Sequence, residues 1–121
     1  MLFRSLGFLE KVGERAMQDG MIGFLGLGAM GGPIAKRMAD WAQRNPGKQI
    51  LAYDPRPDAI RQVAEAGAQR ASSVTEVARQ CRVVLACLPS AEISENVALG
   101  ADGIAAAGGG RIYIEIGRAH V

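Results

Sequence analysis

The chain has few aromatic residues and no large excess of charge of one sign. Both features argue against some classes of binding partner. Of its 121 residues, 5% are aromatic, and the net charge of +2 comes from 14 basic and 12 acidic residues spread along the sequence. Nucleic-acid binding needs a basic patch, often interleaved with aromatic residues. No apolar run approaches the ~20 residues of a membrane span. We therefore expect neither a nucleic acid nor a membrane as a partner.

Cysteine and histidine are also scarce. The two cysteines, Cys81 and Cys87, bracket an apolar run that is typical of a strand. An extended strand holds residues at this spacing too far apart to form a disulfide with each other. We expect two small buried side chains in a reduced, cytoplasmic compartment, rather than metal ligands or a redox pair. The only histidine is His120, so we expect neither a metal site nor His-based catalysis.

Glycine is abundant, and its most informative cluster lies near the start of the chain. A short apolar run, Ile22–Leu25, leads into Gly26-x-Gly28-x-x-Gly31, and a helical apolar pattern follows. A strand, a tight glycine turn and a helix are the context of a dinucleotide-binding fingerprint. Gly26 permits the sharp turn, Gly28 lets a pyrophosphate approach the backbone, and Gly31 lets the helix lie close to the strand. The phosphates would then face the positive end of the helix.

Strands and helices alternate along the rest of the chain, whose length allows one domain. Strands are predicted at residues 22–25, 49–53, 68–71, 82–88 and 111–115. Helices are predicted at residues 29–43, 58–66, 73–80, 90–99 and 104–107, the third opened by a capping box of Ser73 and Glu76. The run at 82–88 is almost continuously apolar, as suits a strand buried on both faces. The pattern predicts an α/β fold with a Rossmann-like, doubly wound parallel sheet and right-handed crossovers.

An acidic residue follows the second predicted strand. Asp54 lies 28 residues after Gly26. A carboxylate at this position accepts hydrogen bonds from the adenosine ribose hydroxyls and repels a 2′-phosphate, which favours NAD. Arg56 could instead clamp a 2′-phosphate bidentately, which would favour NADP. The simpler alternative is that Asp54 only opens the turn before Pro55. We expect the ribose role and, between the two cofactors, NAD over NADP.

Residues 1–20 stand apart from this pattern. Their apolar residues recur at roughly helical spacing, but acidic residues lie among the basic ones, which argues against a transit peptide. Two interpretations remain: a loosely attached helix, or an artefact of an upstream start site. Met21 lies where a start codon before the first strand would fall. We expect residues 1–20 to be such an N-terminal extension and residues 21–115 to form an NAD(P)-binding domain.

Several short motifs together carry a resemblance to a known family. They are Ile22–Pro33 (IGFLGLGAMGGP), Ala52–Asp54 (AYD), Ala66–Ala68 (AGA), Leu88–Ser90 (LPS) and Val97–Ile104 (VALGADGI). With them the chain resembles the β-hydroxyacid dehydrogenase family, which includes 3-hydroxyisobutyrate dehydrogenase, tartronate semialdehyde reductase and the cofactor domain of 6-phosphogluconate dehydrogenase. The resemblance covers residues 21–114 and is nearest to tartronate semialdehyde reductase.

The resemblance implies a site and an activity. In the family, the Leu88-Pro89 step and Ile93 lie beside the nicotinamide half of the cofactor. The implied cofactor-binding residues are Gly26, Leu27, Gly28, Ala29, Met30, Gly31, Asp54, Arg56, Leu88, Pro89 and Ile93. The implied reaction transfers hydride between NAD(P) and a small 3-hydroxy acid or its semialdehyde, with a lysine as acid/base. The implied partners are that small-molecule substrate and, through an all-helical second domain, further copies of the same protein.

The last residues depart from the family pattern. The last strand should run into Asp-x-Ser-(Ser/Thr), but here Glu115 to Val121 read EIGRAHV. A common sequencing-library adapter, ATCGGAAGAGCACACGTC, encodes IGRAHV in one frame. We predict that residues 116–121 are a non-native tail, that Glu115 replaces an Asp, and that the sequence is truncated before the all-helical second domain. The alternative is a genuinely divergent C-terminus. No lysine here matches the family's catalytic lysine, so we expect no catalytic residue and no activity from this chain alone.

Two other functions fit parts of the sequence. A non-enzymatic module that senses NAD(P) through a Rossmann domain would share the glycine fingerprint but would lack the catalytic lysine further along its gene. A flavin-binding oxidoreductase commonly carries Glu at the end of the second strand, whereas this chain has Asp54 there and Leu88-Pro89-Ser90 after the fourth. We therefore expect the NAD(P)-binding domain of a dehydrogenase or reductase and keep the sensing module as the alternative.

Overall fold

A single parallel sheet forms the centre of the molecule. The computed structural model describes residues 18–107 and 111–116. Five strands lie in the order β3-β2-β1-β4-β5, and every neighbouring pair runs parallel. The strands are β1 (Gln18–Leu25), β2 (Gln49–Tyr53), β3 (Gln69–Arg70), β4 (Cys81–Ala86) and β5 (Ile112–Glu115). The predicted parallel sheet is confirmed.

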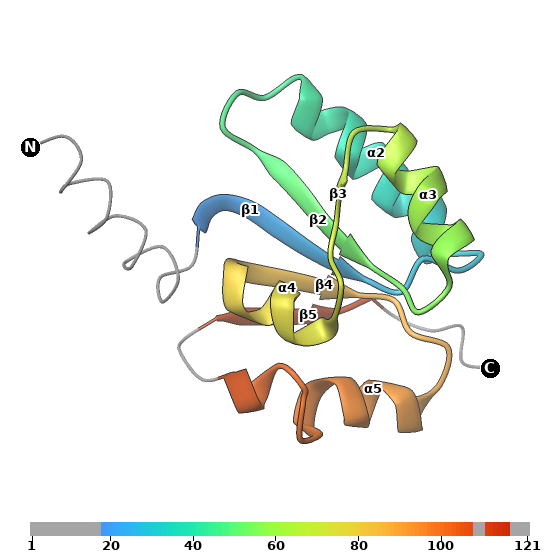
Figure 1. Cartoon of the computed structure of the whole chain (residues 1–121), viewed down its shortest axis with the longest axis vertical. Helices are drawn as coiled ribbons and strands as arrows, with labels where there is room; N and C mark the ends of the chain where they lie inside the picture. Colours follow the sequence, from blue (N-terminus) through green and yellow to red (C-terminus); the bar gives the residue numbers. More distant parts are fainter. Residues whose placement is uncertain (1–17, 108–110, 117–121) are drawn as a thin grey trace, which may run out of the picture.

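Helices cover the sheet from both sides. They are α2 (Gly31–Gln43), α3 (Pro57–Glu65), α4 (Val74–Gln80), α5 (Ala91–Leu99) and the short 3₁₀ helix η1 (Ala105–Ala107). In Figure 1, α2 and α3 lie above the sheet, α5 lies below it, and α4 is drawn over β4 and β5. Residues of α2 and α3 belong to one apolar core, and residues of α4 belong to the other. The chain moves outward from β1 to β3, returns across the sheet to β4, and moves outward again to β5. This reversal beside β1 is the doubly wound topology that the sequence predicts.

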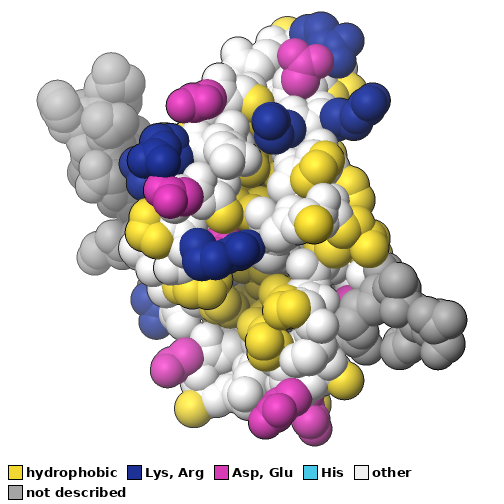
Figure 2. Space-filling model, turned by 90° about the vertical axis from the view of Figure 1, so that its right-hand side faces the viewer, with side chains coloured by type: hydrophobic (Ala, Val, Ile, Leu, Met, Phe, Trp, Pro, Cys, Tyr) yellow, Lys and Arg dark blue, Asp and Glu magenta, His cyan; other side chains and the backbone are white. Residues whose placement is uncertain are grey.

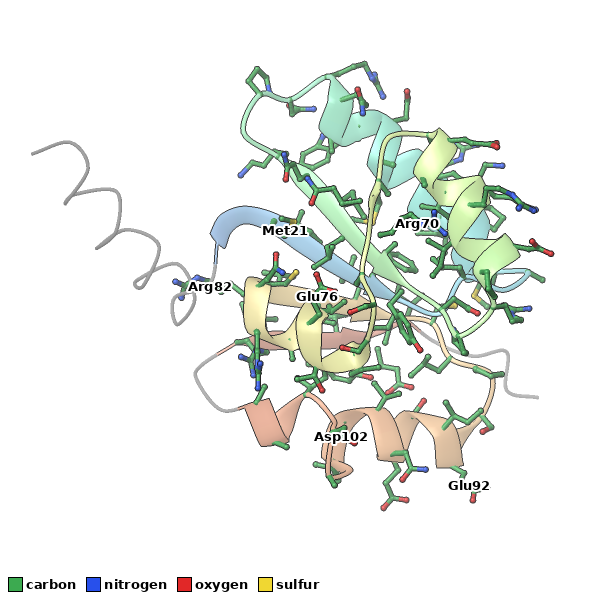
Figure 3. The ribbon with its side chains drawn as sticks, viewed as in Figure 1. Met21, Arg70, Glu76, Arg82, Glu92 and Asp102 are labelled. Carbon is green, nitrogen blue, oxygen red and sulfur yellow. The ribbon has the colours of Figure 1, made fainter. Side chains whose placement is uncertain are left out.

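Each face of the sheet has its own apolar core. Beneath α2 and α3 the buried apolar residues are Phe24, Leu27, Ala35, Ala39, Ala42, Ile50, Ala52, Ile60, Val63 and Ala68. On the other face they are Met21, Leu25, Leu51, Ala71, Val77, Ala78, Cys81, Val84, Ala86, Leu88 and Ile104. The charged side chains of Glu92 and Asp102 point away from this second core, on the outer side of its helical layer (Figure 3). The two cores together bury the centre of the sheet on both faces.

The first strand is longer than the sequence predicts. β1 begins at Gln18 rather than at Ile22, because Gln18 pairs with Cys81 at the start of β4 through a register shift. The strand therefore crosses the predicted border between residues 20 and 21. Residues 1–17 of the predicted extension and residues 117–121 of the predicted tail lie outside the described residues.

Other element boundaries differ from the prediction by one or two residues. α2 begins at Gly31 rather than at residue 29, because residues 29–30 complete the glycine turn. β3 is reduced to Gln69–Arg70. β4 ends at Ala86, although the amide of Cys87 still donates to the Leu25 carbonyl at 2.8 Å. The predicted order and type of the elements are otherwise confirmed.

The predicted serine caps of α4 and α5 are present. Ser73 Oγ accepts the Glu76 amide at 3.0 Å, and Ser90 Oγ accepts the Ile93 amide at 3.2 Å. The capping box is not reciprocal, because the Glu76 carboxylate accepts the amide of Ser72 at 2.6 Å rather than that of Ser73. These caps hold the first turns of both helices at the carboxyl ends of the strands.

Both cysteines are free thiols. Burial raises the pKa of the Cys81 thiol to about 12. Burial also raises the pKa of the half-buried Cys87 thiol. Both thiols are therefore protonated near neutral pH and weakly nucleophilic. Within residues 18–107 and 111–116, none of the helices is both long and apolar enough to cross a membrane.

Candidate functional site

A crevice opens at the carboxyl ends of the strands, where the chain reverses direction across the sheet. β1 leads there into α2 on one face, and β4 leads into α5 on the other, the arrangement in which open α/β sheets bind ligands. Its deeper part is a hollow of about 470 Å³. The lining residues are Leu25, Gly26, Gly28, Ala29, Tyr53, Asp54, Pro55, Arg56, Val74, Leu88, Pro89, Ile93 and Val97. Figure 2 faces this end and shows apolar side chains in a hollow with a basic side chain at its upper edge.

The glycine turn brings the end of β1 against the loop after β4. Gly26 has φ +93°, in the region that favours glycine, and its amide donates to the Tyr53 carbonyl at 3.0 Å. A Cβ at Gly31 would run into the carbonyl oxygen of Gly26 and would lie 3.1 Å from Cys87 Cβ. Gly26 and Gly31 thus have the geometry that the fingerprint predicts, a sharp turn and a close approach at the start of α2.

Gly28 differs from these two glycines, because the space beside it is open. Among the described residues, the only heavy atom near a Cβ built there is Nη2 of Arg56, at 3.6 Å. The missing side chain therefore leaves room in the crevice itself, where a phosphate group fits. The cap residue of α2, Met30, makes no side-chain hydrogen bond, and the first turn has no acidic residue. The positive end of α2 can therefore accept an anion beside Gly28.

A second hollow, of about 710 Å³, lies beside the first on the side of α2 and α3. It is lined by Leu27, Gly28, Ala29, Gly32, Pro33, Lys36, Arg56, Pro57, Asp58, Ala59 and Gln62. Gly28, Ala29 and Arg56 line both hollows and form the border between them. Lys36 brings positive charge to this hollow, whereas Arg56 is paired with Asp54 and the other charged lining residue, Asp58, is paired with Arg61. The charge of Lys36 favours an anionic ligand there.

Asp54 lies at the end of β2 and is 5% exposed. Its Oδ2 accepts the Leu27 amide at 2.8 Å, and its Oδ1 accepts the Arg56 amide at 2.9 Å. Burial by itself raises the pKa of this carboxyl, but the hydrogen bonds from the Arg56 side chain and from the two amides outweigh it and lower the pKa below its ordinary value. Asp54 is therefore ionised near neutral pH, and it fastens the end of β2 to the glycine turn.

The Arg56 guanidinium completes the contacts of this carboxylate. Its Nε donates to Asp54 Oδ1 at 2.9 Å, and its Nη2 donates to Oδ2 at 3.1 Å. The Arg56 side chain is 62% exposed, whereas that of Asp54 is 6% exposed. The hydrogen bond to Asp54 and the charge of that carboxylate raise the pKa of Arg56. The two residues that the sequence offers as competing cofactor determinants therefore form an ion pair.

The opposite wall of the crevice is apolar. Leu88 is buried, and Pro89 and Ile93 are exposed to the crevice, where all three line the deeper hollow. Ile93 and Val97 lie one helical turn apart on α5, so they present one continuous apolar surface. Such a surface packs well against a flat aromatic ring. The crevice thus combines a polar wall that suits phosphates and sugar hydroxyls with an apolar wall that suits a base.

The structure brings most of the predicted residues together. Gly26, Gly28, Ala29, Asp54, Arg56, Leu88, Pro89 and Ile93 line the deeper hollow, and Leu27 lines the second. Met30 and Gly31 line neither of these two, because Met30 is 42% exposed at the helix cap and Gly31 is buried beneath the turn.

Twelve lining residues were not among the predicted site residues, and Tyr53, Val74, Val97 and Lys36 are four of them. Two of these four, Val74 and Val97, could have been predicted from the sequence. The cap at Ser73 places Val74 in the first turn of a helix that begins at the crevice, and Val97 lies four residues after Ile93 on one helix face. Tyr53 and Lys36 had no comparable signal.

Comparison with known proteins agrees with this geometry. Residues 21–121 match the protein family described as the NAD binding domain of 6-phosphogluconate dehydrogenase. The chain belongs to the β-hydroxyacid dehydrogenase family. It forms an NAD-binding domain of that family, with the Rossmann-like fold that its sequence predicts.

Relatives of this NAD-binding domain are longer proteins. Mitochondrial 3-hydroxyisobutyrate dehydrogenase of Mus musculus is 38% identical over 102 residues, which cover 84% of this chain and 29% of the relative. L-threonate dehydrogenase of Cupriavidus necator is 37% identical over 86 residues, which cover 71% of this chain and 27% of the relative. The structure of Mycobacterium tuberculosis 3-hydroxyisobutyrate dehydrogenase with L-serine has a TM-score of 0.65 at 29% identity, and the match covers 80% of this chain and 31% of that one.

The chain therefore spans less than a third of the length of these curated relatives. Both carry the name of a dehydrogenase, which does not favour the non-enzymatic sensing module as the function of this domain.

Proposed function

We propose that this NAD-binding domain serves a dehydrogenase or reductase that transfers hydride between NAD(P) and a small 3-hydroxy acid or its semialdehyde. One observation carries the proposal: the open space beside Gly28 precedes the first turn of α2 and belongs to the same hollow as the buried carboxylate of Asp54. A pyrophosphate would lie at Gly28 and the adenosine ribose next to Asp54. The names of the relatives support the substrate class.

The residues of the crevice would bind and orient the cofactor, and bound NAD(P) would supply the hydride chemistry. The turn at Gly28 and the first turn of α2 would hold the phosphates. Leu88, Pro89 and Ile93 would place an apolar wall beside the nicotinamide and exclude water from it. We also propose that the lysine that acts as acid/base in the family has no counterpart in this chain and that the chain alone does not turn over substrate.

We also propose how the protein is organised beyond the crevice. The predicted cofactor domain, residues 21–115, also includes the first residues of β1 from Gln18 onward. Residues 116–121 are non-native and Glu115 replaces an Asp, which sequencing the source DNA across codons 115–121 tests. The full-length protein is a homo-oligomer through an all-helical second domain, which sedimentation of the full-length gene product tests. We place it in the cytoplasm, which fractionation of the source cells tests.

The phosphate site is tested by substitution at Gly28. A Cβ there meets only ordinary van der Waals contact in the free protein, so Gly28→Ala should fold normally and bind NAD(P) more weakly. Gly28→Val should abolish binding, because its side chain fills the pyrophosphate space. Isothermal titration measures the affinities, and thermal unfolding is the control for the fold. Undiminished NAD(P) affinity in a folded Gly28→Val variant would refute the phosphate site.

The proposed preference for NAD is tested by substitution at Asp54. Asp54→Ser in the full-length protein should improve the use of NADP relative to NAD, because it removes the charge that repels the 2′-phosphate. The measurement is the ratio of kcat/KM for the two cofactors. A wild-type preference for NADP that the substitution leaves unchanged would assign the choice of cofactor to another group.

A further inference from the structure

The hydrogen bonds of Asp54 leave its carboxylate saturated in this structure. Oδ1 accepts from the amide and from Nε of Arg56, and Oδ2 accepts from the Leu27 amide and from Nη2 of Arg56. A carboxylate offers about four lone-pair sites in all. The carboxylate that should hold the ribose therefore has no acceptor site left for a hydroxyl.

The donors to this carboxylate are of two kinds. The Leu27 and Arg56 amides belong to the backbone of the glycine turn and of the loop after β2, so their positions are set by the fold. The guanidinium belongs to a side chain that is 62% exposed. Solvent screens this exposed guanidinium even though its carboxylate partner is buried, so another donor can compete with it for Asp54. Departure of the guanidinium would free one acceptor site on each oxygen and leave both backbone bonds in place.

The departing donors match the donors of a ribose. A guanidinium presents two parallel N–H bonds to the two oxygens of a carboxylate. The neighbouring hydroxyls of a ribose present two O–H donors to the same group. Arg56 also borders both hollows, with Nη2 3.6 Å from the Cβ position of Gly28. The guanidinium therefore lies between the phosphate space and Asp54, where the adenosine ribose would lie.

We propose that Arg56 is a specificity-determining residue that holds the ribose position in the free protein and has to leave it when NAD binds. The inference rests on the proposed function of the crevice. NAD breaks the ion pair and offers the displaced guanidinium no charged partner on the ribose. NADP breaks it too, but its 2′-phosphate accepts the guanidinium. Arg56 therefore weakens NAD binding and strengthens NADP binding. It makes the preference for NAD over NADP smaller than Asp54 alone would produce.

The test compares Arg56→Met with Arg44→Met in the 121-residue chain. Arg56→Met keeps an unbranched stem and removes the guanidinium. Arg44→Met removes the same charge from an arginine of similar exposure, 68% against 62% for Arg56, which pairs with the exposed Asp40 at the opposite end of α2. Isothermal titration gives Kd for NAD⁺ and NADP⁺. The control separates the loss of the ribose-site contact from the general loss of one positive charge.

Relative to Arg44→Met, Arg56→Met should lower the Kd for NAD⁺ roughly two- to fivefold, the modest effect expected when solvent screens the arginine of the pair. It should raise the Kd for NADP⁺ at least about tenfold, because a charge-assisted contact is lost. An unchanged or higher Kd for NAD⁺ would overturn the role of Arg56 and leave the crevice as a cofactor site. Failure of the wild-type chain to bind either cofactor would overturn the proposed function and this inference with it.

A second readout follows the guanidinium itself. The Nε–H resonance of Arg56, identified in an NMR spectrum by its loss in Arg56→Met, should shift on saturation with NAD⁺ toward the position of a solvent-exposed arginine. A resonance that saturation leaves unmoved would show that the ion pair persists in the complex, and it would overturn the proposal.

Discussion

On the face of the sheet that α2 and α3 cover, side-chain burial declines from β2 to β5. Ala52, Phe24, Leu85 and Ile114 are register partners and form one row across four strands. Ala52 is 1% exposed and Phe24 is 0% exposed, whereas Leu85 is half-buried and Ile114 is 46% exposed. All four residues are apolar, so side-chain chemistry does not explain the difference.

The difference follows from the path of the chain. The connections from β1 to β3 carry α2 and α3 over this face, and the later connections run over the other face. Right-handed crossovers require this change of face when the chain reverses its direction across the sheet. The prediction that the run at 82–88 is buried on both faces is therefore wrong for this face, where Val83 and Leu85 are half-buried. Apolar strand residues alone do not determine which half of a sheet is covered.

The largest expected effect lies in the covered half. Phe24→Ala should lower the free energy of unfolding by about 3–5 kcal/mol, because it opens a cavity beneath α2. Urea unfolding followed by circular dichroism measures it, and Phe24→Leu, which keeps most of the volume, should cost less than about 1.5 kcal/mol. A loss of under about 1 kcal/mol for Phe24→Ala would contradict the burial of β1 beneath α2.

An intermediate effect is expected at the end of β2, where Asp54 is buried. Asp54→Asn should cost about 1–3 kcal/mol near neutral pH, because hydrogen bonds to a charged acceptor are lost. The lowered pKa of Asp54 means that its contribution is complete above the ordinary value of 3.8 and is lost as the pH falls through the folded-state pKa. The difference in unfolding free energy between wild type and variant should therefore shrink as the pH falls below 3.8.

Urea unfolding at a series of acidic pH values measures this difference. Arg56→Met is the matched comparison, because it removes the guanidinium and retains both amide donors to the carboxylate. Near neutral pH, Arg56→Met should lower the free energy of unfolding by less than Asp54→Asn does. A pH-independent difference for Asp54→Asn would contradict the depressed pKa of Asp54.

The polar wall of the crevice could be predicted from the sequence because each part depends on a local requirement. A positive φ at Gly26, a close approach at Gly31 and open space at Gly28 each need the absence of a side chain. Asp54 could be predicted because it follows a strand that pairs with β1. These signals are confined to short segments, so one sequence is enough to find them.

Other features depend on contacts between distant or flexible groups. The first residues of β1 form a strand only because Gln18 pairs with Cys81 on β4. The Asp54–Arg56 ion pair depends on how the chain turns at Pro55, and a spacing of two residues does not fix that. The uncovered face of β5 depends on the direction of every earlier crossover. None of these three features can be predicted from the composition or periodicity of the segment in which it occurs.

The smallest expected effect lies at the edge of the uncovered half. Ile114→Ala should change the free energy of unfolding by no more than about 0.5 kcal/mol, because its side chain is 46% exposed and already contacts solvent. Ile50→Ala, on the same face but 1% exposed, should cost about 2–5 kcal/mol. Urea unfolding of both variants at two protein concentrations makes the comparison. A cost at Ile114 that matches the cost at Ile50 would mean that β5 is covered in solution, and a cost that grows with protein concentration would identify a second copy of the chain as the cover.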